Sequence, residues 1–278
     1  MCGIVGFTGN HQAAPILLYG LSRLEYRGYD SAGLAVRDGE GDTEVIKAKG
    51  RLKVLADKTN NGESVPGTCG IGHTRWATHG EPSETNAHPH MSDDGNVVAV
   101  HNGIIENYQE LKDKLIRNGY EFYSSTDTEV AVKLVDYYYK KYLGTPVDAI
   151  NHAMVRIRGS YAMAIMFREY PGEIYVARKD SPMILGVEDG ASYIDASGKT
   201  IWTQSYEMKT PIININGDYA VIADQQGNEM YICSKEGCTG TAKTQLPITK
   251  AAVSARGVAA AVVEDSTASY IFYFKKDG

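Results

Sequence analysis

Short apolar segments of strand length alternate with a few amphipathic helical segments along this chain, and that alternation restricts the fold more than any other feature. The strand candidates extend over 2–8, 31–37, 43–48, 69–76, 97–101, 160–168, 173–178 and 183–187, with shorter pieces up to about 233. The spacing of apolar residues predicts helices that begin near Pro15, Glu106, Thr126 and Thr145. Helices embedded in a strand-rich chain favour an α+β fold, with two packed sheets and the helices outside, over a parallel doubly wound sheet.

The composition excludes several classes of protein. Among 278 residues, 34 acidic and 28 basic side chains are mixed along the chain and give a net charge of -6, so no basic face is available for a nucleic acid. The longest apolar runs, such as Tyr161–Phe167, are far shorter than the roughly 18 residues that span a bilayer. The N-terminus has no basic segment typical of a signal peptide. We therefore expect a soluble, cytoplasmic protein without nucleic-acid or membrane partners.

The cysteines and histidines give no sign of a metal centre. The four cysteines, at positions 2, 69, 233 and 238, are spaced unlike a disulfide framework, so we expect reduced thiols. Cys233 and Cys238 lack a second pair or a nearby histidine that would complete four ligands. Pro89 between His88 and His90 interferes with the regular strand that would point both rings to one side. The sequence therefore predicts no metal, and it shows no internal repeat.

Cys2 is the first candidate catalytic residue. Methionine aminopeptidases remove Met1 when the second residue is small, which would leave Cys2 with a free α-amino group. That amine has an unperturbed pKa of about 7.7 to 8.0, so near neutral pH it can accept the thiol proton of the same residue. A cysteine also occurs at position 2 by chance, so the position alone does not identify a nucleophile.

A polar segment, His73–Gly80, is followed by Asn86–His90, and the two contain more cationic, aromatic and polar side chains than a core strand needs. The planar guanidinium of Arg75 suits a carboxylate. The adjoining Thr78-His79-Gly80 loop can fold over a small ligand. This segment therefore indicates a binding site for a small molecule that carries a carboxylate.

Two further motifs stand where a strand meets a helix. In one, the Asn102 amide and the Gly103 backbone N–H can donate hydrogen bonds to an oxyanion, although Asn-Gly also makes ordinary turns. In the other, Thr126 and Glu129 have the spacing of a capping box, which leaves Asp127 with a spare carboxylate in the first helical turn. Capping alone would also explain that motif.

In this order, the four segments resemble the class II glutamine amidotransferases, whose N-terminal-nucleophile hydrolase fold is a four-layer αββα sandwich. Glu25–Gly33, Arg75–Gly80 and Ser124–Glu129 are most similar to the sugar-phosphate branch of that family, the glutamine:fructose-6-phosphate amidotransferases. The similarity is strong as far as about residue 186 and weaker up to about 233. We therefore expect an amidotransferase domain over 2–233 and a divergent C-terminal extension over 234–278, without isomerase domains.

The resemblance implies catalytic roles for four residues. Cys2 would attack the δ-carbonyl of glutamine and form a γ-glutamyl thioester that water then hydrolyses. Asn102 and the Gly103 amide would form the oxyanion hole, and Arg27 would support the N-terminal residue. The mechanism requires no cofactor and no metal.

The resemblance also implies five substrate-binding residues. Arg75 would hold the α-carboxylate of glutamine and Asp127 its α-ammonium group, which selects a free amino acid because an unpaired charge in a closed pocket is costly. Thr78 and His79 would contact the substrate from a closing loop, and Trp76 would shield the site.

The function implied is glutamine hydrolysis as the amide-donor half of glutamine:fructose-6-phosphate transamination in amino-sugar synthesis. The partner would then be a sugar-phosphate isomerase domain or subunit, and a homodimer is one assembly that the resemblance allows. Two alternatives stay open: a stand-alone glutaminase subunit that serves another acceptor, and a glutamine-binding domain without turnover.

Overall fold

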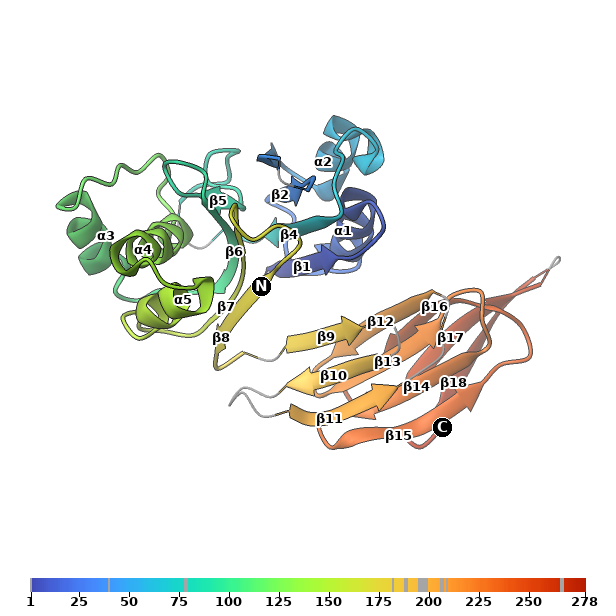
Figure 1. Ribbon diagram of the computed structural model, residues 1–278. Coiled ribbons are helices and arrows are strands. Elements are labelled where there is room, and N and C mark those ends of the chain that lie inside the picture. Colours follow the sequence, from blue (N-terminus) through green and yellow to red (C-terminus); the bar gives the residue numbers. More distant parts are fainter. Residues whose placement is uncertain are drawn as a thin grey trace. The chain divides into compact units, whose positions relative to one another are not determined.

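The computed structural model describes residues 2–39, 41–77, 80–181, 183–187, 190–194, 200–205, 208, 210–265 and 268–278. The chain divides into two compact units, with the boundary between Asp180 and Ser181 (Figure 1). We call them the N-terminal unit and the C-terminal unit.

Two antiparallel sheets form the centre of the N-terminal unit. The first has the strand order β1-β4-β2-β3, with β1 at Gly3–Thr8, β4 at Cys69–Arg75, β2 at Ser31–Arg37 and β3 at Thr43–Lys49. The second has the order β5-β6-β7-β8, with β5 at His90–Met91, β6 at Val97–Gly103, β7 at Tyr161–Phe167 and β8 at Tyr175–Lys179.

Helices cover the outer face of each sheet. On the first lie α1 (Ala13–Ser22) and α2 (Leu52–Lys58). On the second lies α4 (Asp127–Tyr142), flanked by α3 (Tyr108–Ile116) and α5 (Pro146–Met154) (Figure 1). Short 3-10 turns occur at Glu25–Arg27 and Asn60–Gly62.

Strand β2 shows how the layers are built from period-2 alternation. All seven of its residues are buried. Leu34 and Val36 pack with α1 and α2, whereas Ala35 between them packs into the layer that joins the two sheets. A third apolar layer lies between the second sheet and α3, α4 and α5. The order helix, sheet, sheet, helix confirms the predicted four-layer αββα sandwich.

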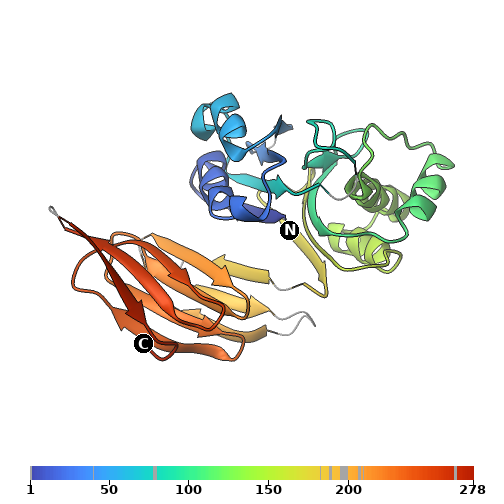
Figure 2. The same ribbon diagram turned by 180° about the vertical axis from the view of Figure 1, so that it is seen from behind.

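The C-terminal unit is built of antiparallel strands (Figures 1 and 2). One sheet contains β9 (Met183–Val187), β10 (Gly190–Ile194) and β11 (Thr200–Ser205). A second contains β12 (Pro211–Asn216), β13 (Tyr219–Asp224), β14 (Glu229–Ser234) and β15 (Gly237–Lys243). A third contains β16 (Ile248–Val253), β17 (Ala259–Glu264) and β18 (Ser269–Phe274). Apolar residues of the second and third sheets share one core.

Glycines with positive φ stand at turns of the second and third sheets. Gly217 precedes β13 and Gly257 precedes β17, and both glycines have positive φ, 61° and 81°. Gly237 and Gly278, also with positive φ, follow β14 and β18.

Two expectations for the C-terminal part differ from the structure. The expected domain boundary between 233 and 234 falls inside β14, whose hairpin with β15 it would divide, whereas the contacts place the division after Asp180. The thiols of Cys233 and Cys238 were expected to be reduced, yet they form a disulfide because β14 and β15 place them directly opposite each other.

In the ranges that the structure describes, every helix is too short or too polar to cross a membrane.

Candidate active site

Cys2 stands at the start of β1, where pairing with β4 brings it to Trp76. Gly3 is opposite Thr74 in that pair. The Trp76 N–H donates to Cys2 Sγ at 3.3 Å, and the thiol donates to the Trp76 carbonyl oxygen at 3.5 Å. The register of two strands therefore fixes the thiol of Cys2 beside the segment that follows β4.

The surroundings of Cys2 act on its thiol in opposite directions. Burial raises the pKa of Cys2, and the nearby carboxylate of Asp30 raises it further. The hydrogen bond from the Trp76 N–H and the positive charge of Arg75 lower it. Because burial is the largest of these effects, the pKa of Cys2 lies above its ordinary value and the thiol needs a base to ionise near neutral pH.

Asn102 reaches the same place from β6 in the other sheet. Its Nδ2 donates to the carbonyl oxygen of Cys2 at 3.1 Å, and its Oδ1 lies 2.9 Å from Nε2 of His73 on β4. Gly103, the next residue, has a φ of 126°, and a Cβ atom there would lie 2.1 Å from the Ser160 carbonyl oxygen. Position 103 therefore accepts only glycine without displacing the backbone.

Arg75 carries a positive charge near Cys2 and interacts in turn with the carboxylate of Asp127. Arg75 is 3% exposed, and its guanidinium donates to the Gly80 carbonyl oxygen at 3.0 Å. The charges of Cys2, Asp127 and Asp30 act on the guanidinium, although burial is the stronger effect and lowers the pKa of Arg75. Asp127 is 5% exposed, and its Oδ2 accepts a hydrogen bond from the Ile105 N–H at 2.9 Å. This part of the site thus contains one buried cation and one buried anion, the charges that complement a zwitterion.

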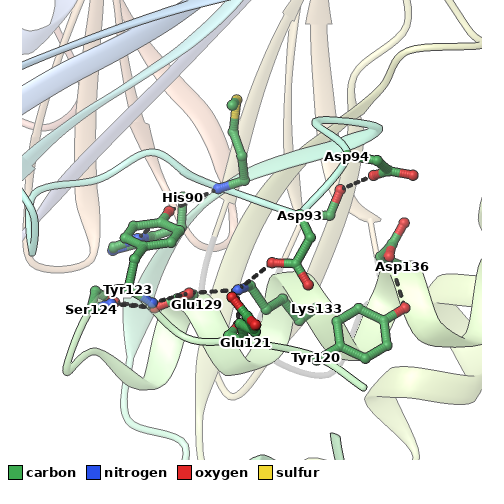
Figure 3. Close-up of polar contacts among 12 residues, drawn as sticks. His90, Asp93, Asp94, Tyr120, Glu121, Tyr123, Ser124, Glu129, Lys133 and Asp136 are labelled. Atoms are coloured by element: carbon green, nitrogen blue, oxygen red, sulfur yellow. Dashed lines mark hydrogen bonds and ion pairs between the residues drawn. The ribbon is translucent and has the colours of Figure 1, made fainter. Parts of the chain in front are cut away.

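A buried polar network holds the start of α4, which carries Asp127 (Figure 3). Glu129 accepts hydrogen bonds from the Tyr123 N–H at 3.0 Å and the Ser124 N–H at 2.7 Å. Lys133 pairs with Glu129 at 2.8 Å and with Asp93 at 2.7 Å. Since Glu129 and Lys133 are at most 1% exposed, little solvent weakens the contact between them, and Glu129 holds the loop before Asp127.

The side chains of Arg27 and Trp76 contact tyrosines next to the site. Arg27 Nε donates to Tyr26 Oη at 2.9 Å, so its side chain is directed to its neighbour. Trp76 is 44% exposed and its ring meets Tyr29 edge-on at 5.3 Å between centroids. Thr78 and His79, predicted to contact the substrate, lie outside the described residues, as does Met1.

The sequence interpretation assigned no role to Asp30 or His73. Asp30 Oδ2 accepts a hydrogen bond from the Ala77 N–H at 2.9 Å and so holds the segment after β4. Asp30 lies within the Glu25–Gly33 motif, which was noticed only for its similarity. His73 was noted as part of the polar segment His73–Gly80, and its position in the sequence gave no indication that it meets Asn102.

Two family models match the chain. A glutamine amidotransferase domain matches residues 73–204, and a family of unknown function, DUF5711, matches residues 180–278. The latter begins at the boundary of the C-terminal unit. Together with the αββα fold and the cysteine at its first strand, these matches show that the N-terminal unit is a class II glutamine amidotransferase domain.

Several similar curated proteins are glutamine–fructose-6-phosphate aminotransferases (isomerizing). The protein of Caldanaerobacter subterraneus subsp. tengcongensis is 54% identical over 194 residues, which cover 70% of this chain and 31% of that protein. The protein of Pyrococcus horikoshii is 42% identical over 245 residues, 88% of this chain and 39% of that protein. The chain thus spans about a third of the length of these relatives.

Solved structures agree on the fold. The glutamine phosphoribosylpyrophosphate amidotransferase from B. subtilis, complexed with ADP and GMP, superposes with a TM-score of 0.59 at 22% identity, over 91% of this chain and 51% of that one. A structure described as the allosteric regulatory enzyme of purine biosynthesis gives a TM-score of 0.54 at 25% identity, with the same coverage. These two amidotransferases therefore share the N-terminal-nucleophile hydrolase fold with this chain.

Proposed function

We propose that this chain hydrolyses glutamine to glutamate and ammonia with Cys2 as the nucleophile. One observation carries the proposal. The positive charge of the buried Arg75 acts on the Cys2 thiol, and the charge of Asp127 acts on Arg75. The Asn102 amide donates a hydrogen bond to the carbonyl oxygen of Cys2. Glutamine presents a carboxylate, an ammonium group and a carbonyl to be attacked, and each has a candidate partner here.

The reaction follows from this arrangement. Once Met1 is removed, the α-amine of Cys2 takes the thiol proton, and the thiolate attacks the δ-carbonyl carbon of glutamine. The oxygen of that carbonyl becomes negative and receives hydrogen bonds from Asn102 Nδ2 and the Gly103 N–H. The protonated amine then gives its proton to the leaving nitrogen, which departs as ammonia. Water, deprotonated by the same amine, cleaves the γ-glutamyl thioester and releases glutamate.

The substrate contacts would come from strand β4 of the first sheet and from helix α4, which covers the second sheet. Arg75, at the end of β4, would bind the α-carboxylate, while Asp127, at the start of α4, would bind the α-ammonium group. Trp76, Thr78 and His79 would close over the bound glutamine, and Arg27 would support Cys2. These roles agree with the positions of Arg75 and Asp127, and they apply to a free amino acid rather than to a peptide.

Glutamate release from glutamine by the purified chain tests the proposal, with mass spectrometry of the N-terminus to verify that Met1 is gone. Cys2→Ala is expected to release no glutamate. Cys69→Ala is the matched control, because Cys69 is a second free cysteine but is buried in the layer between the sheets. Turnover that persists in Cys2→Ala, or binding of glutamine without turnover by the wild type, would refute the proposal, and the latter result would favour the non-catalytic alternative.

The ammonia is proposed to serve transfer to fructose 6-phosphate in amino-sugar synthesis, as the names of the relatives suggest. The acceptor chemistry would need a sugar-phosphate isomerase domain or subunit, with which the chain would act in the cytoplasm, alone or as a homodimer. With fructose 6-phosphate and glutamine, the chain of 278 residues is expected to give glutamate but no amino sugar. An amino-sugar product from this chain alone would contradict the need for a partner.

A further inference from the structure

The side-chain amide of Asn102 can adopt two orientations, and only the one with Nδ2 towards the reacting carbonyl can stabilise an oxyanion. Nδ2 can donate a hydrogen bond to a negative oxygen, whereas Oδ1 would repel it. In the structure, Nδ2 faces Cys2 and Oδ1 faces Nε2 of His73 at 2.9 Å. A contact between Oδ1 and a ring nitrogen is a hydrogen bond only if that nitrogen carries a proton. His73 must therefore be the Nε2–H tautomer.

The ring of His73 is held neutral and in place. It is fully buried, and burial, together with the neighbouring His101 and Arg75, lowers the pKa of His73 to about 3. It stacks on the ring of His88, with 4.1 Å between centroids and 30° between planes. A neutral imidazole has one N–H, so the proton that faces Asn102 is the only one that His73 carries near neutral pH.

The supporting ring of His88 is itself fixed by a defined chain of hydrogen bonds. The His101 backbone N–H donates to His88 Nδ1 at 3.4 Å, so the proton of His88 is on Nε2. That Nε2 donates to Thr128 Oγ1 at 3.1 Å, and Thr128 Oγ1 lies within hydrogen-bond distance of His101 Nδ1, at 3.0 Å. Thr128 is in the first turn of α4, next to Asp127. The chain thus connects the helix that carries Asp127 with the ring that faces Asn102.

We propose that His73 is a positioning residue, which holds the Asn102 amide so that Nδ2, and never Oδ1, faces the oxygen of the reacting carbonyl. This inference rests on the proposed role of Asn102 in glutamine hydrolysis. The hydrogen bond joins β4 of the first sheet to β6 of the second, so it also sets the distance between the cysteine side and the oxyanion side of the site. If the Nε2–H donor is lost, the Asn102 amide can rotate by about 180° so that Oδ1 faces the reacting carbonyl. Molecules with the rotated amide lack one of the two oxyanion donors.

Two amide substitutions that differ by one methylene test this role. The side-chain nitrogen of His73→Gln can take the place of imidazole Nε2, whereas that of His73→Asn is too short to reach Asn102 Oδ1. His73→Asn is expected to lower kcat for glutamine by about 10- to 100-fold with KM changed less than about twofold, because the missing donor acts on the transition state. His73→Gln is expected to keep kcat within about threefold of the wild type, since an oxyanion donor is then still oriented.

A control and a coupling measurement separate positioning from general damage. His152→Asn replaces a histidine of α5, whose ring packs against Tyr142 with 4.4 Å between centroids, and is expected to leave kcat unchanged. In an Asn102→Ala background, His73→Asn is expected to cause no further loss of kcat, because the group that it positions is already gone.

The outcomes distinguish this inference from the proposed function. If Asn102→Ala loses activity but a folded His73→Asn turns over at the wild-type rate, the positioning role is overturned and glutamine hydrolysis stands. Equal losses in His73→Gln and His73→Asn would overturn it as well, because the effect would then not depend on the donor. If the wild type with Cys2 at its N-terminus releases no glutamate, the proposed function itself fails.

Discussion

The N-terminal and C-terminal units differ in what they bury. The N-terminal unit buries ionisable side chains in numbers that a stable core does not need, among them His73, Arg75, His88, His90, His101, Asp127, Glu129, Lys133 and Asp136. Among the described side chains of the C-terminal unit, Thr244 is the buried polar one. Burying an ionisable group is costly unless it is paired. Buried ionisable side chains thus gather around the candidate active site, whereas the described core of the C-terminal unit is almost entirely apolar.

The largest expected effect comes from a cavity in the core of the C-terminal unit, which tests whether the two units are independent in stability. Ile232 is 1% exposed and packs in the core that the second and third sheets share. Ile232→Ala is expected to destabilise the C-terminal unit by about 2 to 5 kcal/mol. Glutamine turnover by the N-terminal unit is expected to stay unchanged. Hydrogen-exchange mass spectrometry and a glutaminase assay on the same sample measure both. A fall in turnover would show that the two units are not energetically separate.

Acid is expected to affect the two units differently. Burial lowers the pKa values of His73, His88 and His90, whereas an unfolded histidine titrates near 6.5. Below that pH the unfolded chain binds protons that the folded unit excludes, so the stability of the N-terminal unit is present above about pH 6.5 and is lost as pH falls towards the folded pKa. The loss approaches about 1.4 kcal/mol per pH unit for each of these histidines.

The C-terminal unit is the internal control for the acid prediction, because all seven histidines of the chain precede it. Hydrogen exchange at pH 7 and pH 5 is expected to show faster opening in the N-terminal unit after correction for the intrinsic rate. His73→Gln is expected to reduce the pH dependence. Equal acid sensitivity of both units would contradict the assignment to buried histidines.

The smallest effect concerns two helix caps inside the N-terminal unit. Thr126 Oγ1 accepts from the Glu129 N–H at the start of α4, and Thr145 Oγ1 accepts from the Asp148 N–H at the start of α5. Either threonine-to-alanine change is expected to destabilise the unit by about 1 kcal/mol. Only Thr126→Ala is expected to raise KM for glutamine, because Asp127 is the residue that follows this cap. Thermal unfolding and kinetics on both variants check the pair, and a raised KM in Thr145→Ala would argue against a local cause.

The helices and strands of the N-terminal unit could be predicted because its apolar periodicity and helix-capping residues match the burial that the structure shows. The predicted strand over 31–37 is β2 to the residue, and the helix predicted from Thr145 has a complete capping box with Asp148. The box predicted at Thr126 is only half formed, since the Glu129 carboxylate bonds the N–H groups of Tyr123 and Ser124 instead. The short helix α2 was missed, because its seven residues carry little periodicity.

The site was predictable where a residue type implies its chemistry, and not where only the fold brings partners together. The guanidinium of Arg75 was predicted to suit a carboxylate, whereas its pairing with Asp127 around an amino acid came only from the family resemblance. The charge of Asp127 acts on Arg75 in the structure. The contact between His73 and Asn102 joins strands of different sheets, so no local pattern could reveal it. The pairing of Cys233 with Cys238 likewise depended on the register of β14 and β15.

Strand β2 has a further consequence. Its neighbouring side chains belong to different apolar layers, Leu34 and Val36 to one and Ala35 to the other. A single inserted or deleted residue within this strand would exchange the occupants of two cores at once, sending small side chains where large ones pack and the reverse. Length changes during evolution or engineering should therefore be confined to the connection between β2 and β3, leaving the spacing from Ser31 to Arg37 unaltered.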